Sequence, residues 1–288
     1  MFKQRVRHIF AVAVFALATP LRGQPPDTNL WSSVEQVPQG RGTADAWVQP
    51  AVFRAFNLNH TALQPNLRRA LPEAAQRAAA SPTLITLPMP DGTLARFRFV
   101  ESPVMEPELA AKFPEIKTYA GQGVDDPGAS ARFDITPSGF HAQVLSPRGA
   151  VFIDPYFRGD TNLYACYYKR DHRRALEDFQ CLLAGKDANG GGASAQSAQL
   201  MPPLISGGNL RTYRLACAAT AEYTAYQGGS LAAGMSAIVT AINRVTGVYE
   251  TEVAIRLVLV GNNNLIVYTN ASTQPYTNNN PSLLLSQN

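Results

Sequence analysis

The sequence has few residues that could hold a metal ion, and these are scattered along the chain. Its 288 residues include four histidines, His8, His60, His141 and His172, and none has another histidine within five residues. Zinc-dependent hydrolysis of the H-E-x-x-H type needs two histidines one helical turn apart, with a glutamate between them. The sequence therefore predicts no metal site of this kind and no cofactor bound by this chain.

Cysteine is also scarce, with only Cys166, Cys181 and Cys217 in the whole sequence. Three cysteines are too few for a disulfide-based scaffold, and their separations of 15 and 36 residues match no zinc knuckle. Cys166 with Cys181 is the predicted disulfide if the protein is exported to an oxidising compartment. The alternative is a buried, inert thiol, and the odd number leaves at least one cysteine outside any intramolecular pair.

Net charge almost vanishes outside the first 23 residues. Lys3, Arg5, Arg7 and Arg22 lie in that segment, which has no acidic residue, and the rest of the chain has 21 basic and 21 acidic residues. A basic stripe that could neutralise phosphates is therefore missing, and we expect no nucleic acid partner.

Residues 1–23 have the order of a secretory signal peptide. Three basic residues precede an apolar stretch of about ten residues, Ile9 to Ala18, and a small or polar exit follows. We therefore expect a secreted or periplasmic protein, the alternative being an N-terminal anchor that stays attached. No later segment reads as long and apolar enough for a membrane span, which needs about 20 apolar residues.

Residues 24–184 predict a β-rich antiparallel domain. Alternating runs flank the turn sequences PDGT, TPSG and SPRG, which begin at Pro90, Thr136 and Ser146. Each turn contains the glycine that a tight hairpin needs for a positive φ. We expect four to six antiparallel strands in this domain.

Two short helical segments are expected within the same domain. Leucines recur at roughly helical spacing between Leu58 and Leu71, where Pro65 and Pro72 should break any long helix. A second short helix and an extended link are expected within residues 106–123. Neither segment predicts a catalytic site.

A second unit follows a linker. Residues 185–206 are rich in Gly, Ser, Ala and Gln without apolar periodicity, which is typical of a flexible linker. Residues 207–288 then show a strand, a long helical apolar stripe and a second strand at Val253–Val260. A strand, helix and strand in this order normally place the two strands parallel. The predicted fold class is therefore α+β, an antiparallel β-rich domain followed by the opening of an α/β domain.

The long helix of the second unit is expected to begin after Ser230, as N-cap, and to end near Gly247. With two strands and one helix, the unit should leave one sheet face and the sheet edges uncovered. We therefore expect its amides to exchange faster than those of the β-rich domain, and we expect uncovered edges to favour self-association.

Two sequence features carry both a catalytic and a structural interpretation. The string GGSLAAG around Ser230 superficially suggests a serine nucleophile, but its spacing departs from G-x-S-x-G, and an N-cap is favoured. Asp125 and Asp126 lie in a turn flanked by Gly and Pro, where they could bind calcium or act as paired carboxylates. Solvated loop acids are the favoured interpretation of this pair.

Two long strings resemble a known family. LPMPDGTLARFRFVESPVMEPELAAKFPEIKTYAGQGVDDPGASARFDITPSGFHA resembles the propeptide region of secreted bacterial zinc metalloproteases of the reprolysin-like (metzincin) group. The order RTYRLA, EYTAY, NRVTGVYE, RLVLV resembles the first strand, first helix and second strand of their catalytic domain. The resemblance runs from about residue 31 to the C-terminus. It implies a zincin fold, a zinc cofactor and cleavage of protein or peptide substrates in full-length relatives.

The zinc-binding motif of that family, H-E-x-x-H-x-x-G-x-x-H, lies downstream of both matched strings. No position of this sequence can receive a metal ligand or a general base from it. We therefore expect an N-terminal zymogen fragment, truncated before the zinc site and itself inactive. The resemblance also makes Cys181 a candidate inhibitory propeptide thiol, because thiolate is a strong zinc ligand. The alternative function is a secreted β-rich binding or interaction module without a catalytic role.

Overall fold

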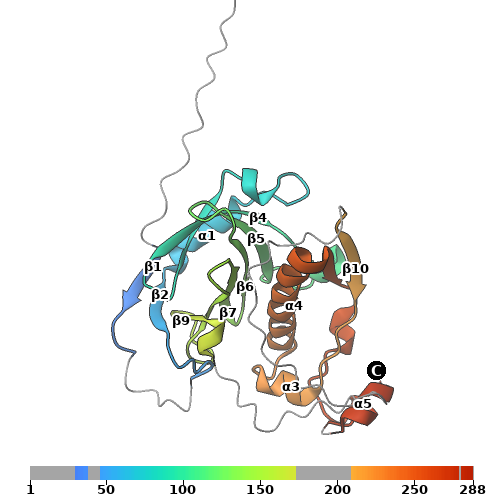
Figure 1. Ribbon diagram of the computed structural model, residues 1–288. Helices are drawn as coiled ribbons and strands as arrows, with labels where there is room; N and C mark the ends of the chain where they lie inside the picture. Colours follow the sequence, from blue (N-terminus) through green and yellow to red (C-terminus); the bar gives the residue numbers. More distant parts are fainter. Residues whose placement is uncertain (1–29, 38–45, 173–208, 279, 288) are drawn as a thin grey trace, which may run out of the picture.

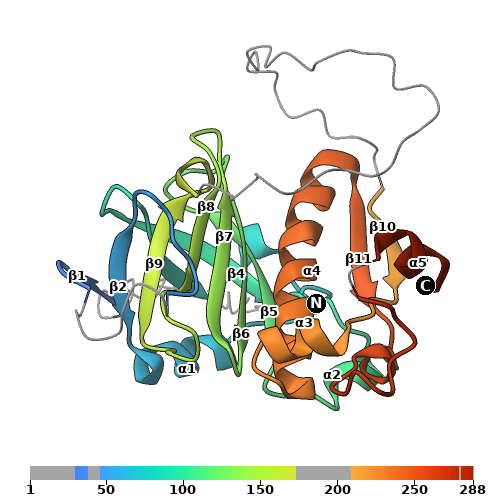
Figure 2. The ribbon, with the colours of Figure 1, turned by 90° about the horizontal axis from the view of Figure 1, so that it is seen from below.

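The computed structural model describes residues 30–37, 46–172, 209–278 and 280–287, and it has three layers. A curled antiparallel sheet forms one side, a long helix crosses its outer face, and a small parallel sheet covers the other side of that helix (Figures 1 and 2). The predicted signal peptide, the predicted linker and Cys181 lie outside the described residues. The α+β class is confirmed at the level of mixed helix and strand with a large antiparallel sheet.

The curled sheet has nine strands among the described residues, more than the four to six expected. In spatial order they are β1 (Trp31–Val34), β2 (Arg54–Leu58), β9 (Leu163–Tyr168), β8 (Val151–Pro155), β7 (Gly139–Leu145), β6 (Ser130–Thr136), β5 (Lys117–Gly123), β4 (Leu94–Glu101) and β3 (Leu84–Pro88). The three predicted hairpins are confirmed as β3–β4, β6–β7 and β7–β8. Their turn residues Gly92, Gly139 and Gly149 all have positive φ. The extra strands were missed because β1 and β2 are short, and β2 pairs with β9, which lies about a hundred residues later in the chain.

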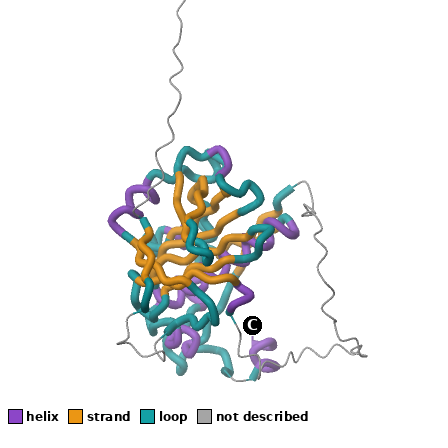
Figure 3. Tube along the Cα trace, turned by 60° about the vertical axis from the view of Figure 1, so that its left-hand side comes forward, coloured by secondary structure: helices purple, strands orange, loops and turns teal. Residues whose placement is uncertain are grey.

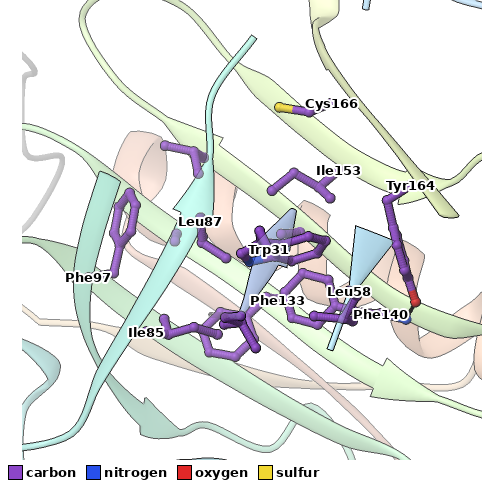
Figure 4. Close-up of a cluster of buried hydrophobic side chains, with 14 of the residues drawn as sticks. Trp31, Leu58, Ile85, Leu87, Phe97, Phe133, Phe140, Ile153, Tyr164 and Cys166 are labelled. Atoms are coloured by element: carbon purple, nitrogen blue, oxygen red, sulfur yellow. Dashed lines mark hydrogen bonds between the residues drawn. The ribbon is translucent and has the colours of Figure 1, made fainter. Parts of the chain in front are cut away.

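The sheet curls around an apolar core on its inner face (Figures 3 and 4). Its two edges approach each other, since the indole Nε1 of Trp31 on β1 donates a hydrogen bond to the carbonyl of Thr86 on β3 at 2.8 Å. Large side chains fill the interior, among them Phe133, Phe140 and Tyr164, all with no exposed surface. This closure makes the inner face a complete core, so the outer face is left to contact other elements.

The helices of this half of the chain are short. The segment expected between Leu58 and Leu71 is α1 (His60–Arg68), which packs leucines on the core and contains Pro65 rather than breaking there. The segment expected within residues 106–123 gives α2 (Pro107–Ala110) and then β5. Two single turns complete the half, η2 (Ala78–Ala80) and η3 (Lys169–Asp171).

The C-terminal unit contains the predicted strand, helix and parallel strand. Its elements are β10 (Arg211–Leu215), α3 (Ala221–Tyr226), α4 (Leu231–Val253), β11 (Ile255–Leu259), η5 (Asn263–Ile266) and α5 (Pro281–Gln287). The two strands are parallel in register from Arg211 opposite Ile255 to Leu215 opposite Leu259. This pairing confirms the predicted crossover.

The start of α4 is confirmed and its expected end is wrong. Ser230 accepts a hydrogen bond from the Ala233 amide through its side-chain oxygen at 3.0 Å, as an N-cap does. The helix continues past Gly247 to Val253 and ends where Ala254 takes a left-handed conformation, with φ of 54°. Gly247 has another use, because a Cβ there would lie 2.7 Å from Cγ of Arg132. The glycine lets the helix backbone approach the curled sheet.

The expectation of uncovered sheet edges in the C-terminal unit is wrong for β11, whereas residues 211–214 of β10 are exposed. Helix α4 lies between β6 of the curled sheet and the small sheet, so both of its sides are packed (Figure 2). The outer edge of β11 is paired with residues 104–106, since the Leu259 amide donates to the Val104 carbonyl at 2.8 Å and the Glu106 amide donates to the Leu259 carbonyl at 2.9 Å. Among the described residues, β10 has no partner on its outer edge. Self-association therefore stays a prediction for that edge.

Helix α4 also corrects the expectation that no segment after the N-terminus is long and apolar enough to span a membrane. Its 23 residues meet that test by length and composition. The apolar residues lie against the small sheet and residues 104–116, and polar residues face β6 to β8 with ion pairs and hydrogen bonds. Packing within the protein accounts for the composition of this helix.

Candidate functional site

The candidate functional site is the contact between helix α4 and the outer face of the curled sheet. Alternation along β6 and β7 sends aromatic residues inward and polar residues outward. The outward residues form cross-strand pairs, with Asp134 opposite His141 and Arg132 opposite Gln143. All four are buried, as is Asp154 on the neighbouring β8, because α4 covers this surface. Buried polar groups in such numbers need partners, and α4 provides several of them.

Asp134 is the centre of the first group of contacts. Its carboxylate is 3.0 Å from Nδ1 of His141, and it accepts a hydrogen bond from the Thr240 hydroxyl at 2.9 Å. The side-chain amide of Asn243 donates to the Phe133 carbonyl at 3.0 Å and approaches the second carboxylate oxygen of Asp134 at 3.4 Å. Two residues one turn apart on α4 are therefore fixed on one strand of the sheet.

Asp154 and Arg244 form a buried ion pair beside it. Nη2 of Arg244 donates to the Asp154 carboxylate at 2.6 Å, and the Tyr167 hydroxyl donates to its other oxygen at 2.9 Å. Burial alone would raise the pKa of Asp154, but the positive charge of Arg244 together with the hydrogen bonds from Arg244 and Tyr167 holds the pKa below its ordinary value. Burial, the Asp154 charge and this hydrogen bond together raise the pKa of the Tyr167 hydroxyl, which stays protonated as a donor.

A third group lies at the C-terminal end of α4. Glu250 accepts hydrogen bonds from Arg132 of β6 and from Arg256 of β11. Arg256 also donates to Glu73 at 2.8 Å, and Arg132 donates to the Ser102 hydroxyl at 2.8 Å. Burial would raise the pKa of Glu73, yet hydrogen bonds and the charge of Arg256 lower it overall. This network joins the helix, both sheets and the segment before β3.

An apolar cluster extends the contact on the far side of α4. From the first half of the chain it contains Val104, Met105, Leu109, Phe113 and Ile116, and from the second half Ala219, Met235, Ile238, Val239, Ile242, Leu259 and Val267. The two halves therefore share one core. At its rim, Glu106 accepts hydrogen bonds from Arg214 at 2.5 Å and from the Gly261 amide at 2.7 Å.

Of the residues singled out from the sequence, His141 lies in this contact, and the described cysteines and the loop acids fall outside it. Cys166 is buried in the curled sheet, where its thiol donates to the Pro88 carbonyl at 3.2 Å and burial raises its pKa. Because Cys181 lies outside the described residues, the predicted disulfide and the inhibitory thiol stay predictions. Asp125 accepts hydrogen bonds from the Arg96 guanidinium and amide, and Asp126 accepts one from the Gly128 amide. Both carboxylates thus serve the loop structure.

The described part of the chain offers no fit for a zinc ion. It contains no group of three or more His, Cys, Asp and Glu side chains placed to hold a metal. His60 lies 2.5 Å from the Thr161 carbonyl, His141 contacts Asp134, and the ring of His172 packs on Tyr167. The histidines are thus used in three separate places, and we derive no zinc chemistry from them.

Sequence reasoning missed the contact itself. A usable signal was present, since ARFDI, GFHAQ and FIDP each place a charged or polar residue on the face opposite a large apolar one. Asn243, Arg244 and Glu250 likewise interrupt the apolar pattern of the long helix. Polar residues on both elements are the sign that they meet, but the pattern gives no pairing between them.

Acid should weaken this contact. In the unfolded chain Asp154 takes up a proton near its ordinary pKa of 3.8, whereas its pKa in the folded protein is lower. A depressed folded pKa contributes stability above the ordinary value and loses that contribution as the pH falls through the folded value. The pKa of Glu73 is also below its ordinary value of 4.5 in the folded protein, so its contribution to stability is likewise lost in acid. We expect the urea midpoint to hold from about pH 7 to about pH 5 and to fall below about pH 4.

The control is the variant Asp154→Asn, whose urea midpoint is measured over the same pH range. Its stability should decline less steeply in acid, because the group whose pKa is depressed is gone. Equal slopes for the two proteins would contradict the assignment to Asp154.

The geometry defines a mixed α and β protein in which a curled antiparallel sheet holds a strand, helix and parallel strand unit against its outer face. Comparison with known proteins places that unit more closely. Residues 209–285 match the model of Metallo-peptidase family M12B, Reprolysin-like. The match begins just before β10 and ends within α5, so it covers the unit that the curled sheet holds. It supports a reprolysin-like metallopeptidase, whereas no curated protein matches the chain.

Proposed function

We propose that these 288 residues are the front part of a secreted zinc-dependent metalloendopeptidase zymogen. In this proposal residues 1–23 are the signal peptide, residues 24–184 are the pro-segment, residues 185–206 are the linker, and residues 207–288 open the catalytic domain. The observation that carries it is the family match on residues 209–285, a unit whose apolar core is completed by residues 104–116, between β4 and β5. Zinc and peptide-bond hydrolysis are what the family implies for full-length relatives.

The pro-segment acts in this proposal as a holder of the catalytic unit. Residues 104–106 pair with the edge of β11, and the buried ion pair of Asp154 with Arg244 fixes α4. A strand added to a sheet edge and a desolvated ion pair are both specific to one docked geometry. Cys181 keeps its proposed part as a thiol ligand that fills the open zinc position of the longer protein.

The proposal also holds that the present chain is inactive, because none of its residues forms H-E-x-x-H. The purified chain is assayed with casein in the presence of zinc, with and without a chelator, and its metal content is measured. We expect no chelator-sensitive turnover and no stoichiometric zinc. One tightly held zinc ion per chain, together with turnover that the chelator abolishes, would contradict the proposal.

The holding role has its own test. A specific protease site is inserted within residues 185–206 of the full chain, and the cleaved protein is examined by native gel filtration. We expect the two pieces to elute together and to separate on unfolding in urea. Separation under native conditions would remove the holding role.

A further inference from the structure

A cavity of about 460 Å³ lies between the N-terminal half of α4 and the outer side of β7, β8 and the loops that adjoin them. The helix presents Ala233, Ala237 and Ala241 to it, at successive turns. These small side chains leave space where the helix would otherwise fill it. The opposite wall includes Trp47 and Phe157. The volume and the largely apolar walls fit the general form of a small-molecule site.

The inner end of the cavity has polar nitrogens without a full set of partners. His141 lines it and uses Nδ1 on Asp134, while no described residue bonds its Nε2. Arg244 also lines it, and its Nε is buried without a hydrogen-bond partner among the described residues. Buried polar atoms of this kind are normally satisfied by water or by a ligand. A hydroxyl group at the inner end would donate to Nε2 of His141, which is an acceptor when Nδ1–H is bound to Asp134.

The cavity lining also carries one guanidinium with no described carboxylate partner. Arg158 packs against a pair of aromatic rings that also contact each other: its Cζ is 4.0 Å from the ring centroid of Trp47 and 4.3 Å from that of Tyr226, and the two centroids are 5.5 Å apart. Its described contacts are these two rings, and no described acid forms an ion pair with it. Contact with the two rings holds the guanidinium in place and leaves N–H groups that point away from the rings to bind an anion.

We propose that this cavity binds a small organic acid of the hydroxyphenyl-carboxylate type. The carboxylate is bound by Arg158, the ring lies between the alanines of α4 and Phe157, and the hydroxyl meets His141 and Arg244. Arginine favours carboxylate because its planar fork can donate two parallel hydrogen bonds. The same chemistry is present in a free acid and in the C-terminal tyrosine of a peptide. This site is independent of the metallopeptidase proposal, since it uses none of that family's zinc chemistry.

Calorimetric titration of the full chain with 3-(4-hydroxyphenyl)propionate tests the site. We expect saturable binding with one molecule per chain, and affinity at least about tenfold weaker for the amide of the same acid. Weaker binding by the same factor is expected for Arg158→Gln, and Arg158→Lys should fall in between because it keeps the charge without the fork. Equal affinity for acid and amide would overturn the proposal, as would the absence of saturable binding.

Two further variants distinguish loss of the binding site from loss of the folded structure. Ala237→Leu should abolish binding by filling the cavity. Arg170→Gln is the matched control, since Arg170 also stacks on an aromatic ring, at 4.1 Å from the Tyr168 centroid, but outside the cavity lining. It should bind as the parent chain does, and all variants are checked for unchanged thermal unfolding. Equal losses in Arg158→Gln and Arg170→Gln would overturn the proposal.

A last arm distinguishes the source of the carboxylate. A short peptide ending in tyrosine is compared with its C-terminal amide and with the free acid. If the peptide acid binds at least as well as the free acid, the site takes peptide C-termini. If only the free acid binds, the site takes a small molecule. Failure of both ligands would overturn the proposal and leave the metallopeptidase assignment unaffected.

Discussion

Replacing Arg244 by methionine should lower the free energy of unfolding by about 3 kcal/mol. Asp154 would keep its hydrogen bond from Tyr167 but lose the cation that balances its charge inside the protein. Breaking one member of a buried pair leaves an uncompensated charge, which costs far more than the net worth of the pair. The methionine fills a similar space, so a cavity contributes little to the effect.

Equilibrium urea unfolding gives the measurement, and an exposed ion pair gives the control. Arg148 lies 3.5 Å from the Asp126 carboxylate with its side chain largely exposed, so Arg148→Met should change stability by less than about 1 kcal/mol. In a double-mutant cycle with Asp154→Asn, the double variant should recover part of the loss. Similar small effects for Arg244→Met and Arg148→Met would show that the contact of α4 with the sheet is not energetically specific.

The second large effect is expected at Leu259. Its side chain is fully buried in the core that both halves share, and its backbone pairs with residues 104–106. Leu259→Ala keeps the backbone hydrogen bonds but removes apolar volume from a close-packed site. We expect destabilisation of about 3 kcal/mol, from lost burial together with the cavity that is left.

Leu265→Ala is the matched control for Leu259→Ala, because Leu265 follows a few residues later and is 68% exposed. Its effect should stay within about 0.5 kcal/mol. Both variants are unfolded in urea under the same conditions. If Leu259→Ala costs less than about 1 kcal/mol, the shared core does not bind the two halves together as the packing indicates.

Features that depend on local chemistry could be predicted from the sequence. The turns at Gly92, Gly139 and Gly149 each need a positive φ, and three or four consecutive residues of each turn are enough to predict it. The N-cap at Ser230 and the parallel pairing of β10 with β11 are local in the same sense. The family resemblance of residues 209–285 was likewise carried by short strings in a fixed order.

Features that depend on distant pairing could not be predicted in this way. Strand alternation shows that Arg132 and Asp134 share a face. It does not predict that a helix more than a hundred residues later covers this face. Gly247 was interpreted as a helix stop because that is the commonest local meaning of glycine. Its role here is set by Arg132, which lies far away in the sequence. The pairing of β11 with residues 104–106 could not be predicted either, because these two segments are also far apart in the sequence.

The position of α4 between the two sheets has a consequence for the order of folding. All nine strands of the curled sheet lie before residue 169, so a ribosome releases the whole sheet before the helix is made. Domains form from the N-terminus onward during synthesis. Asp134, His141 and Asp154 are then hydrated on a finished surface, and their water is removed only when α4 arrives. Docking of the helix removes water from these charged groups, so its rate should respond to pH and salt more than sheet formation does.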